Sequence, residues 1–171
     1  MNKIEVIAMP SWEIRPMLKK DAWEISRWKY EEPYSFYNRT DEPPYPTNPD
    51  AQITDGFSVW GHDGQLIGYF HFGEDGHIPT EENYVYDSAY LDIGLGMRPD
   101  LCSRGTGEAF VRFGLSFAKA HYGARQFRLS VAAFNERAIK VYERAGFVKQ
   151  CAVTNARFKN QFYIMRTPTL I

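Results

Sequence analysis

The chain has 171 residues, of which 44% are hydrophobic and 16% aromatic, and its 20 Lys and Arg nearly balance 21 Asp and Glu. This composition fits one globular domain, excludes a disordered chain, and disfavours nucleic acid as the main ligand because the formal charge is −1. No apolar run approaches the ~20 residues that a membrane span needs, and residues 1–12 lack a signal-peptide pattern. We therefore expect a cytoplasmic protein without a membrane partner.

Acidic and basic residues are unevenly distributed along this nearly neutral chain. Residues 1–30 hold six basic and four acidic groups, residues 31–92 hold one and thirteen, and residues 93–171 hold thirteen and four. The three segments therefore carry net charges of +2, −12 and +9. This separation predicts that the middle and C-terminal parts bind ligands of opposite sign.

The cysteine content argues against both a disulfide framework and a zinc site. Cys102 and Cys151 are too few for such a framework, and neither has a second Cys or a His at a zinc-binding spacing. We therefore expect two free thiols and no metal. The basic C-terminal part still leaves a phosphate-bearing small ligand open.

The residue pattern in the first half of the chain predicts mostly strands. Asp21 caps a helix, and Pro33 either ends this helix or starts a new turn. Residues 33–49 form an ordered loop that is rich in proline and aromatic residues and can include a helical turn. The turn His62-Asp63-Gly64 joins two strands into a hairpin, and an acidic surface loop precedes the next strand. The expected strands span residues 11–16, 57–61, 65–72 and 88–97.

From Met97 onward the pattern changes to alternating helices and strands. The expected helices span residues 105–122 and 136–145, and the strands span 127–131, a stretch from 147, and 158–165. This order predicts an α+β fold, with an α/β arrangement in the C-terminal half. We expect one domain over residues 1–171, with a core at about 11–165, in which about four helices flank a mixed sheet of six or seven strands.

A glycine-rich turn, Ser103-Arg-Gly-Thr-Gly107, opens the first of these later helices. Free amides at a helix start carry a positive dipole end, and glycines let a ligand approach the backbone. With Arg104 nearby, the turn predicts a pyrophosphate cradle, and the alternative reading is a tightly packed helix start. The spacing fits neither a Walker P-loop nor the Rossmann fingerprint, which disfavours kinases and dehydrogenases.

A second motif lies on the following helix. At 100° per residue, Asn135, Ala138 and Tyr142 share one helix face, with an amide at one end and a phenol about two turns on. Two simpler interpretations remain open, because Asn135 can be only a helix cap and Tyr142 can be ordinary core packing.

Together these segments resemble the acetyl-CoA-binding motifs of the GNAT superfamily of N-acetyltransferases. The family pattern Arg/Gln-x-x-Gly-x-Gly/Ala matches Cys102-Ser-Arg-Gly-Thr-Gly, and Asn-x-x-Ala-x-x-x-Tyr-x-x-x-Gly-Phe matches residues 135–147. Cys102 departs from the usual Arg or Gln, which leaves Arg104 and the backbone amides to hold the phosphates. The resemblance implies a sequential transfer of acetyl from acetyl-CoA to a primary amine of a small molecule or peptide amino terminus.

The resemblance also implies roles for particular residues. The arm and pyrophosphate of the coenzyme A thioester would be bound by Leu95, Met97, Ser103, Arg104, Gly105, Thr106, Gly107, Asn135 and Ala138. The amide of Leu95 would meet the oxyanion, and Tyr142 would protonate the leaving thiolate. Homodimers occur in the family, so a homodimer is expected by analogy only.

The general base is less defined by the sequence. Some family members use a Glu on the strand before the glycine turn, and the matching place here is about Leu91, with Asp92 next to it. Asp92 serves as the base only if a bulge shifts the strand register, because neighbouring strand residues face opposite sides. A structural acid is the alternative for Asp92, and His71 and Glu74 are further candidate bases.

The acceptor site is expected in the acidic middle segment. Tyr34, Tyr37, Asn38 and Asp41 would form a pocket for a cationic amine, although these rings can also simply pack against the domain. The alternative function is a noncatalytic acyl-CoA-binding sensor of the same fold, in which Tyr142 does not reach the thiol.

Overall fold

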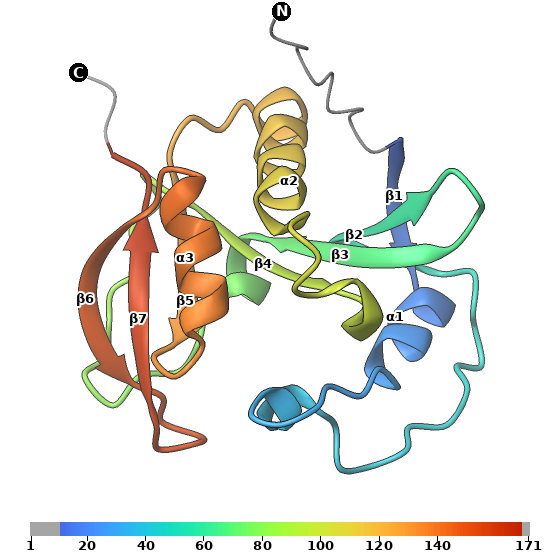
Figure 1. Ribbon diagram of the computed structural model, residues 1–171, viewed down its shortest axis with the longest axis horizontal. Coiled ribbons are helices and arrows are strands. Elements are labelled where there is room, and N and C mark those ends of the chain that lie inside the picture. The colour runs from blue at the N-terminus through green and yellow to red at the C-terminus, as the bar shows by residue number, and fades with distance from the viewer. Residues whose placement is uncertain (1–10, 169–171) are drawn as a thin grey trace, which may run out of the picture.

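The computed structural model describes residues 11–168, which form one sheet of seven strands in the order β1-β2-β3-β4-β5-β7-β6 (Figure 1). The predicted mixed α+β sheet is confirmed, with three α-helices in place of about four and three short 3-10 turns. The strands are β1 (Trp12–Leu18), β2 (Gln52–Gly61), β3 (Leu66–Phe72), β4 (Leu91–Met97), β5 (Phe127–Ala132), β6 (Val148–Thr154) and β7 (Gln161–Arg166). The helices are α1 (Lys19–Ser26), α2 (Gly107–Tyr122) and α3 (Glu136–Arg144), and the 3-10 turns are η1 (Tyr34–Tyr37), η2 (Gly73–Gly76) and η3 (Pro99–Leu101). None of the helices in this described part has the length and apolar character to cross a bilayer.

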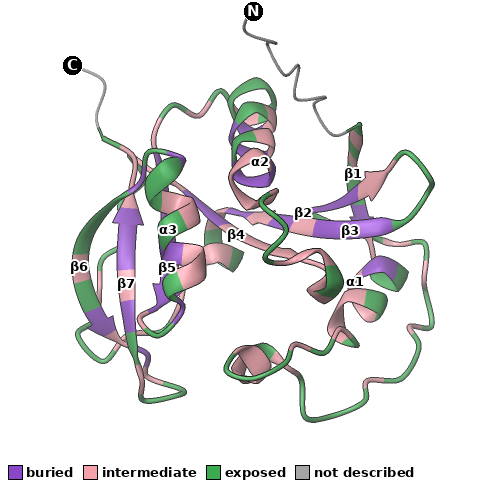
Figure 2. Cartoon of the chain, viewed as in Figure 1, coloured by how far each residue is buried: buried purple, intermediate pink, exposed green. Residues whose placement is uncertain are grey.

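Helix α2 packs against the middle strands through an aromatic core. Phe70 of β3 stacks on Phe110 of α2 with ring centroids 4.6 Å apart, and both side chains are fully buried. A Cβ on Gly114 would come within 2.3 Å of the Phe70 ring, so only glycine allows this approach. Burial of each Phe side chain stabilises the folded state by roughly 1.5–3 kcal/mol relative to leaving it exposed. Figure 2 shows the buried face of α2 against the sheet.

The sheet divides between β4 and β5, and this division positions the site. These two strands run parallel and are paired only at Leu91–Phe127 and Asp92–Arg128 within the described chain. Beyond these pairs, β4 continues beside β3, whereas β5 continues antiparallel to β7. Figure 1 shows the two halves of the sheet running in different directions, with α3 over β5. The divergence leaves backbone edges of both strands free to pair with something else.

Several boundaries in the N-terminal half differ from the sequence-based expectation. Helix α1 already ends at Ser26, before Pro33, and β2 begins at Gln52, five residues earlier than expected. Strand β1 continues through Pro16, which pairs with Phe57, because β1 is an edge strand and tolerates a missing N–H donor. Helix α1 begins at Lys19, and Asp21 lies in its first turn, where its carboxylate accepts the backbone N–H of Leu18 at 2.9 Å. Asp21 therefore caps the helix from inside the first turn.

Candidate active site

A cavity of about 890 Å³ lies where β4 and β5 diverge. One side, here called the cofactor-side wall, comes from residues 93–97, 101–111 and 129–144, and the other, the acceptor-side wall, comes from residues 25–39 and 69–78. The first wall contains both sequence motifs. The second wall brings α1, η1, β3 and η2 together around the same space.

The glycine-rich turn contributes backbone to the cofactor-side wall. Ser103, Gly105 and Gly107 line the cavity, whereas Arg104 and Thr106 are absent from its lining. Gly105 has φ +78°, which favours glycine, and a Cβ on Gly107 would lie 3.0 Å from the Val141 side chain. The turn therefore faces the cavity and also lets α2 start close against α3, and its role as a pyrophosphate cradle stays a prediction.

A cation that the sequence analysis did not single out supports this turn. Arg137 lines the cavity, donates from Nη1 to the Ser103 hydroxyl at 2.9 Å, and lies 3.8 Å over the Tyr34 ring. Helical angles place Arg137 about 200° from Asn135, so it lies off the helix face that Asn135 shares with Ala138 and Tyr142. Its long side chain nevertheless reaches the glycine turn, where Cys102 supplies no charge.

Cys102 itself makes only weak polar contacts. Its thiol lies 3.7 Å from the Met97 carbonyl oxygen and 3.6 Å from that of Arg98. Burial is the main cause of the raised pKa of Cys102, so the thiol stays protonated near neutral pH. Cys102 therefore fills space in the wall and donates only weak S–H hydrogen bonds to backbone carbonyls. Both Cys102 and Cys151 are free thiols.

Asn135 is a helix cap, as one interpretation of the sequence suggested, and its binding of the thioester arm stays a prediction. Its side-chain oxygen accepts the backbone N–H of Ala138 at 3.1 Å, which makes it the N-cap of α3. Its amide nitrogen donates to the Tyr37 hydroxyl at 3.0 Å. Asn135 thus joins the N-terminus of α3 to η1 at the edge of the cavity, which Ala138 also lines.

Tyr142 lines the cavity from α3 and is half-buried. Burial raises the pKa of Tyr142 well above its ordinary value, and the neighbouring Tyr37 and Tyr69 raise it further. The phenol is therefore protonated at neutral pH and can donate a proton. Its position in the cavity distinguishes it from a residue that only fills the core.

The strand segment on the cofactor-side wall is shaped by two tyrosines. Leu95 and Met97 line the cavity, and the Met97 carbonyl accepts the Tyr30 hydroxyl at 2.7 Å. The Tyr69 ring lies over Gly96, where an added Cβ would come within 2.5 Å of it. Neither Tyr30 nor Tyr69 belongs to a recognisable motif, so the sequence analysis missed both.

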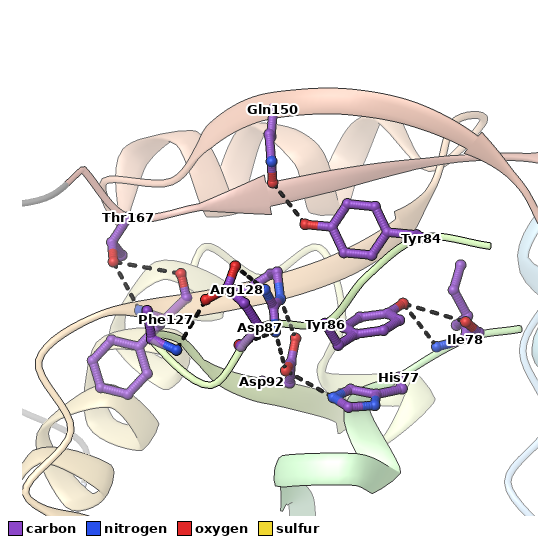
Figure 3. Close-up of polar contacts among 11 residues, drawn as sticks. His77, Ile78, Tyr84, Tyr86, Asp87, Asp92, Phe127, Arg128, Gln150 and Thr167 are labelled. Carbon is purple, nitrogen blue, oxygen red and sulfur yellow. Dashed lines mark hydrogen bonds and ion pairs between the residues drawn. The ribbon is translucent and has the colours of Figure 1, made fainter. Parts of the chain in front are cut away.

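Asp92 lies outside the cavity lining, in a buried ion-pair cluster (Figure 3). It is 3% exposed, and both carboxylate oxygens accept from Arg128 at 2.7 Å, with His77 Nε2 2.9 Å from one of them. Register is regular from Leu91 to Met97, so the bulge that a catalytic role required is absent from this strand. We therefore assign Asp92 to holding β4 and β5 together.

His71 is the candidate base that faces the cavity. It lines the cavity from β3, and its Nδ1 is buried without a hydrogen-bond partner among the described residues. Burial lowers the pKa of His71, while the Asp75 carboxylate opposes this shift more weakly. The imidazole is therefore neutral at neutral pH and can accept a proton, whereas Glu74 is exposed and outside the lining.

The four expected acceptor residues separate into two pairs. Tyr34 and Tyr37 line the cavity. Asn38 and Asp41 do not, because the Asn38 side chain bonds the backbone of Tyr30 and the Asp41 carboxylate pairs with Arg39 at 2.8 Å. The aromatic half of the expected pocket is therefore at the cavity, and the polar half stabilises the loop.

The acidic middle segment contributes little negative charge to the cavity. Of its thirteen acidic residues, only Asp75 lines the cavity. Several others bind elsewhere: Asp50 pairs with Lys20, Glu81 with Lys159, and Asp55 accepts from Tyr122. The charge separation in the sequence mostly reflects surface and structural contacts of this segment.

Solved structures share this fold. A chimera of the spermidine N-acetyltransferase SpeG from Vibrio cholerae and hSSAT has a TM-score of 0.65 and 18% identity, covering 91% of this chain and 94% of its own. The aminoglycoside acetyltransferase AAC(6')-Ib in complex with coenzyme A and kanamycin has a TM-score of 0.67 and 18% identity, covering 93% and 95%.

Sequence comparison gives a nearer relative and the family. A mycothiol acetyltransferase of Streptomyces coelicolor is 38% identical over 93 residues, which are 54% of this chain and only 27% of that relative. The chain thus matches about a quarter of the relative's length. The sequence model of the Acetyltransferase (GNAT) family matches residues 18–147, which include the glycine turn, Asn135 and Tyr142. The chain therefore belongs to the Acetyltransferase (GNAT) family.

Proposed function

We propose that this protein is an N-acetyltransferase that transfers the acetyl group of acetyl-CoA directly to a primary amine. The observation that carries the proposal is the position of Tyr142, a protonated phenol that faces the cavity at which β4 and β5 diverge. A phenol there can donate to a thiolate leaving from an arm bound between the strands.

The cavity fits the thioester arm and phosphates of coenzyme A. The free edge of β4 at residues 93–97 offers backbone groups to an extended, amide-bearing arm. On β5, Ser130 lines the cavity, and its buried hydroxyl has no hydrogen-bond partner among the described residues. The pyrophosphate would bind the first amides of α2 and the Arg137 guanidinium.

The proposed reaction takes its base from the acceptor-side wall and its oxyanion and proton donors from the cofactor-side wall. His71 takes the proton of the bound ammonium, directly or through a water, and the free amine attacks the thioester carbonyl. The oxyanion is met by a β4 amide, for which Leu95 is the expected donor. As the new C–N bond forms and the C–S bond breaks, Tyr142 gives its proton to the sulfur. The nitrogen loses its second proton as the amide forms, and this proton returns through water to the Tyr142 phenolate, while His71 releases the first proton to solvent.

The raised pKa of Tyr142 is compatible with this step. Burial raises the pKa of the phenol because it destabilises the phenolate. The same low-polarity surroundings destabilise a departing thiolate, so the sulfur also becomes a stronger proton acceptor. Positioning within the cavity then governs the transfer more than the pKa values in water.

The test incubates the protein with acetyl-CoA and each member of a panel of primary amines and a short peptide. Mass spectrometry detects the acetylated product, and a thiol assay measures the free CoA that is released. The proposal expects an acetylated amine and stoichiometric CoA. Tight binding of CoA without turnover of any amine would instead identify a noncatalytic acyl-CoA-binding sensor.

A further inference from the structure

The acceptor-side wall is unusually rich in rings. Five aromatic side chains line it, supplied by the segment after α1, by η1 and by β3: Trp28, Tyr30, Tyr34, Tyr37 and Tyr69. Tyr69 occupies the centre, because its ring lies 6.3 Å from that of Trp28 and 5.5 Å from that of His71. The proposed base and the ring surface are therefore neighbours.

These rings lie on the same side as the proposed chemistry. Tyr37 and Tyr69 are close enough to Tyr142 to influence its pKa, and Tyr37 is fixed by Asn135 at the start of α3. Tyr30 is fixed through its hydroxyl to the Met97 carbonyl. An acceptor whose amine reaches the thioester must therefore place the rest of its body against this aromatic surface.

Charge on this wall is close to zero. Arg39 and Asp75 are the residues with full charges that line it, and Arg39 already pairs with Asp41 through two contacts of 2.8 and 3.0 Å. On this wall one exposed carboxylate, Asp75, remains to attract a cation, whereas Glu108 and Glu136 line the opposite wall. A spermidine or an aminoglycoside carries several ammonium groups, and desolvating each without a carboxylate is costly.

We infer that the acceptor carries a single amino group on a flat apolar body, as in an arylalkylamine; this inference rests on the proposed function. The body packs against Tyr69 and Trp28, in the edge or offset arrangements that rings favour. The lone ammonium is positioned between the ring faces and Asp75 until His71 removes its proton.

The first test compares 2-phenylethylamine with spermidine and kanamycin as acceptors. We expect kcat/KM for 2-phenylethylamine to exceed that for either polycation by roughly tenfold or more. The same amines are titrated calorimetrically into the protein saturated with CoA, so that acceptor binding is measured even if no acetyl is transferred. Tighter binding or faster transfer of a polycation would overturn the inference, while leaving the N-acetyltransferase proposal intact.

The second test removes the central ring. Tyr69→Leu keeps an apolar side chain, and we expect the KM or dissociation constant for 2-phenylethylamine to rise roughly tenfold. Because the Tyr69 ring also lies over Gly96, the KM for acetyl-CoA can rise as well, but by clearly less than the KM for the amine. A general loss of folding would instead lower kcat through the fraction of active protein and leave both KM values unchanged. Tyr45→Leu is the matched control, because Tyr45 is 55% exposed and outside the cavity lining. Equal effects of the two variants on the aromatic amine would overturn the inference.

Discussion

The cofactor-side wall of the cavity presents free backbone groups and several glycines beside its side chains, whereas the acceptor-side wall presents mainly large aromatic side chains. On the first wall, the glycine turn, the free β4 edge and the N-cap of α3 offer amides and carbonyls. On the second, five rings from three separate elements define the surface. Backbone recognition suits a constant ligand, while side chains provide the specificity for a variable one.

The buried ion pair of Asp92 and Arg128 joins β4 and β5, the strands that contribute to the cavity. It lies at the last paired position of β4 and β5, immediately before they diverge. Tyr84, Tyr86 and Tyr90 surround the Arg128 guanidinium with ring centroids 5.0–5.8 Å away. The pair therefore fixes the geometry from which both walls extend.

The largest expected effect comes from breaking this pair. Arg128→Met leaves the Asp92 carboxylate buried without its main partner, and we expect the free energy of unfolding to fall by about 3–5 kcal/mol. Denaturant unfolding monitored by circular dichroism measures this change. The double variant Arg128→Met with Asp92→Asn should regain part of the loss, because the uncompensated charge is gone. A loss below about 1 kcal/mol in the single variant would show that the pair does not hold the sheet together.

The next effect concerns the base on the acceptor-side wall. His71→Gln should lower kcat by roughly 100-fold, because general-base catalysis is lost. In the proposed mechanism, activity of the unsubstituted protein requires the neutral imidazole, and burial lowers the pKa of His71. Activity should therefore fall toward acid with a midpoint below the ordinary His value of about 6.5.

The pH–rate profile of kcat/KM checks this assignment. The acidic limb should disappear in His71→Gln and persist in the control His62→Gln, whose imidazole lies in the exposed hairpin turn. An unchanged acidic limb in His71→Gln would assign the base to another group.

A smaller effect separates the two walls directly. Arg137→Met removes the guanidinium beside Ser103, and we expect the dissociation constant for CoA to rise roughly tenfold, as for loss of a charge-assisted hydrogen bond. Affinity for the amine should change little. Calorimetric titration with CoA and, separately, with the amine measures both affinities. Arg125→Met is the control, because Arg125 is exposed and lies outside the cavity lining. Equal weakening of both ligands would mean that Arg137 supports the walls in common.

The sequence predicted the cofactor-side wall better than the acceptor-side wall, and for a physical reason. The glycine turn and the Asn135–Tyr142 face are local in sequence, because a helix start and a helix face are fixed by residues a few positions apart. Their elements were predicted to within two residues of the observed α2 and α3. Structural features that depend on residues a few positions apart can therefore be predicted from the sequence alone.

The acceptor-side wall depends on contacts between distant segments. Tyr30 reaches Met97, and Tyr37 reaches Asn135, across 67 and 98 residues of sequence. No spacing rule encodes these pairs, so Tyr30 and Tyr69 were missed, and Asn38 and Asp41 were placed in a pocket they do not line. The charge count misled for the same reason, since composition does not show which carboxylates already have partners.

The most direct test of the account is the kinetics of Tyr142→Phe. This change removes one hydroxyl from the cavity and leaves the ring and helix α3 in place. We predict that kcat for acetyl transfer falls by roughly 100-fold or more, while the KM for acetyl-CoA stays within about twofold. A kcat equal to that of the unmodified protein would contradict the assignment of Tyr142 as the proton donor to the leaving thiolate.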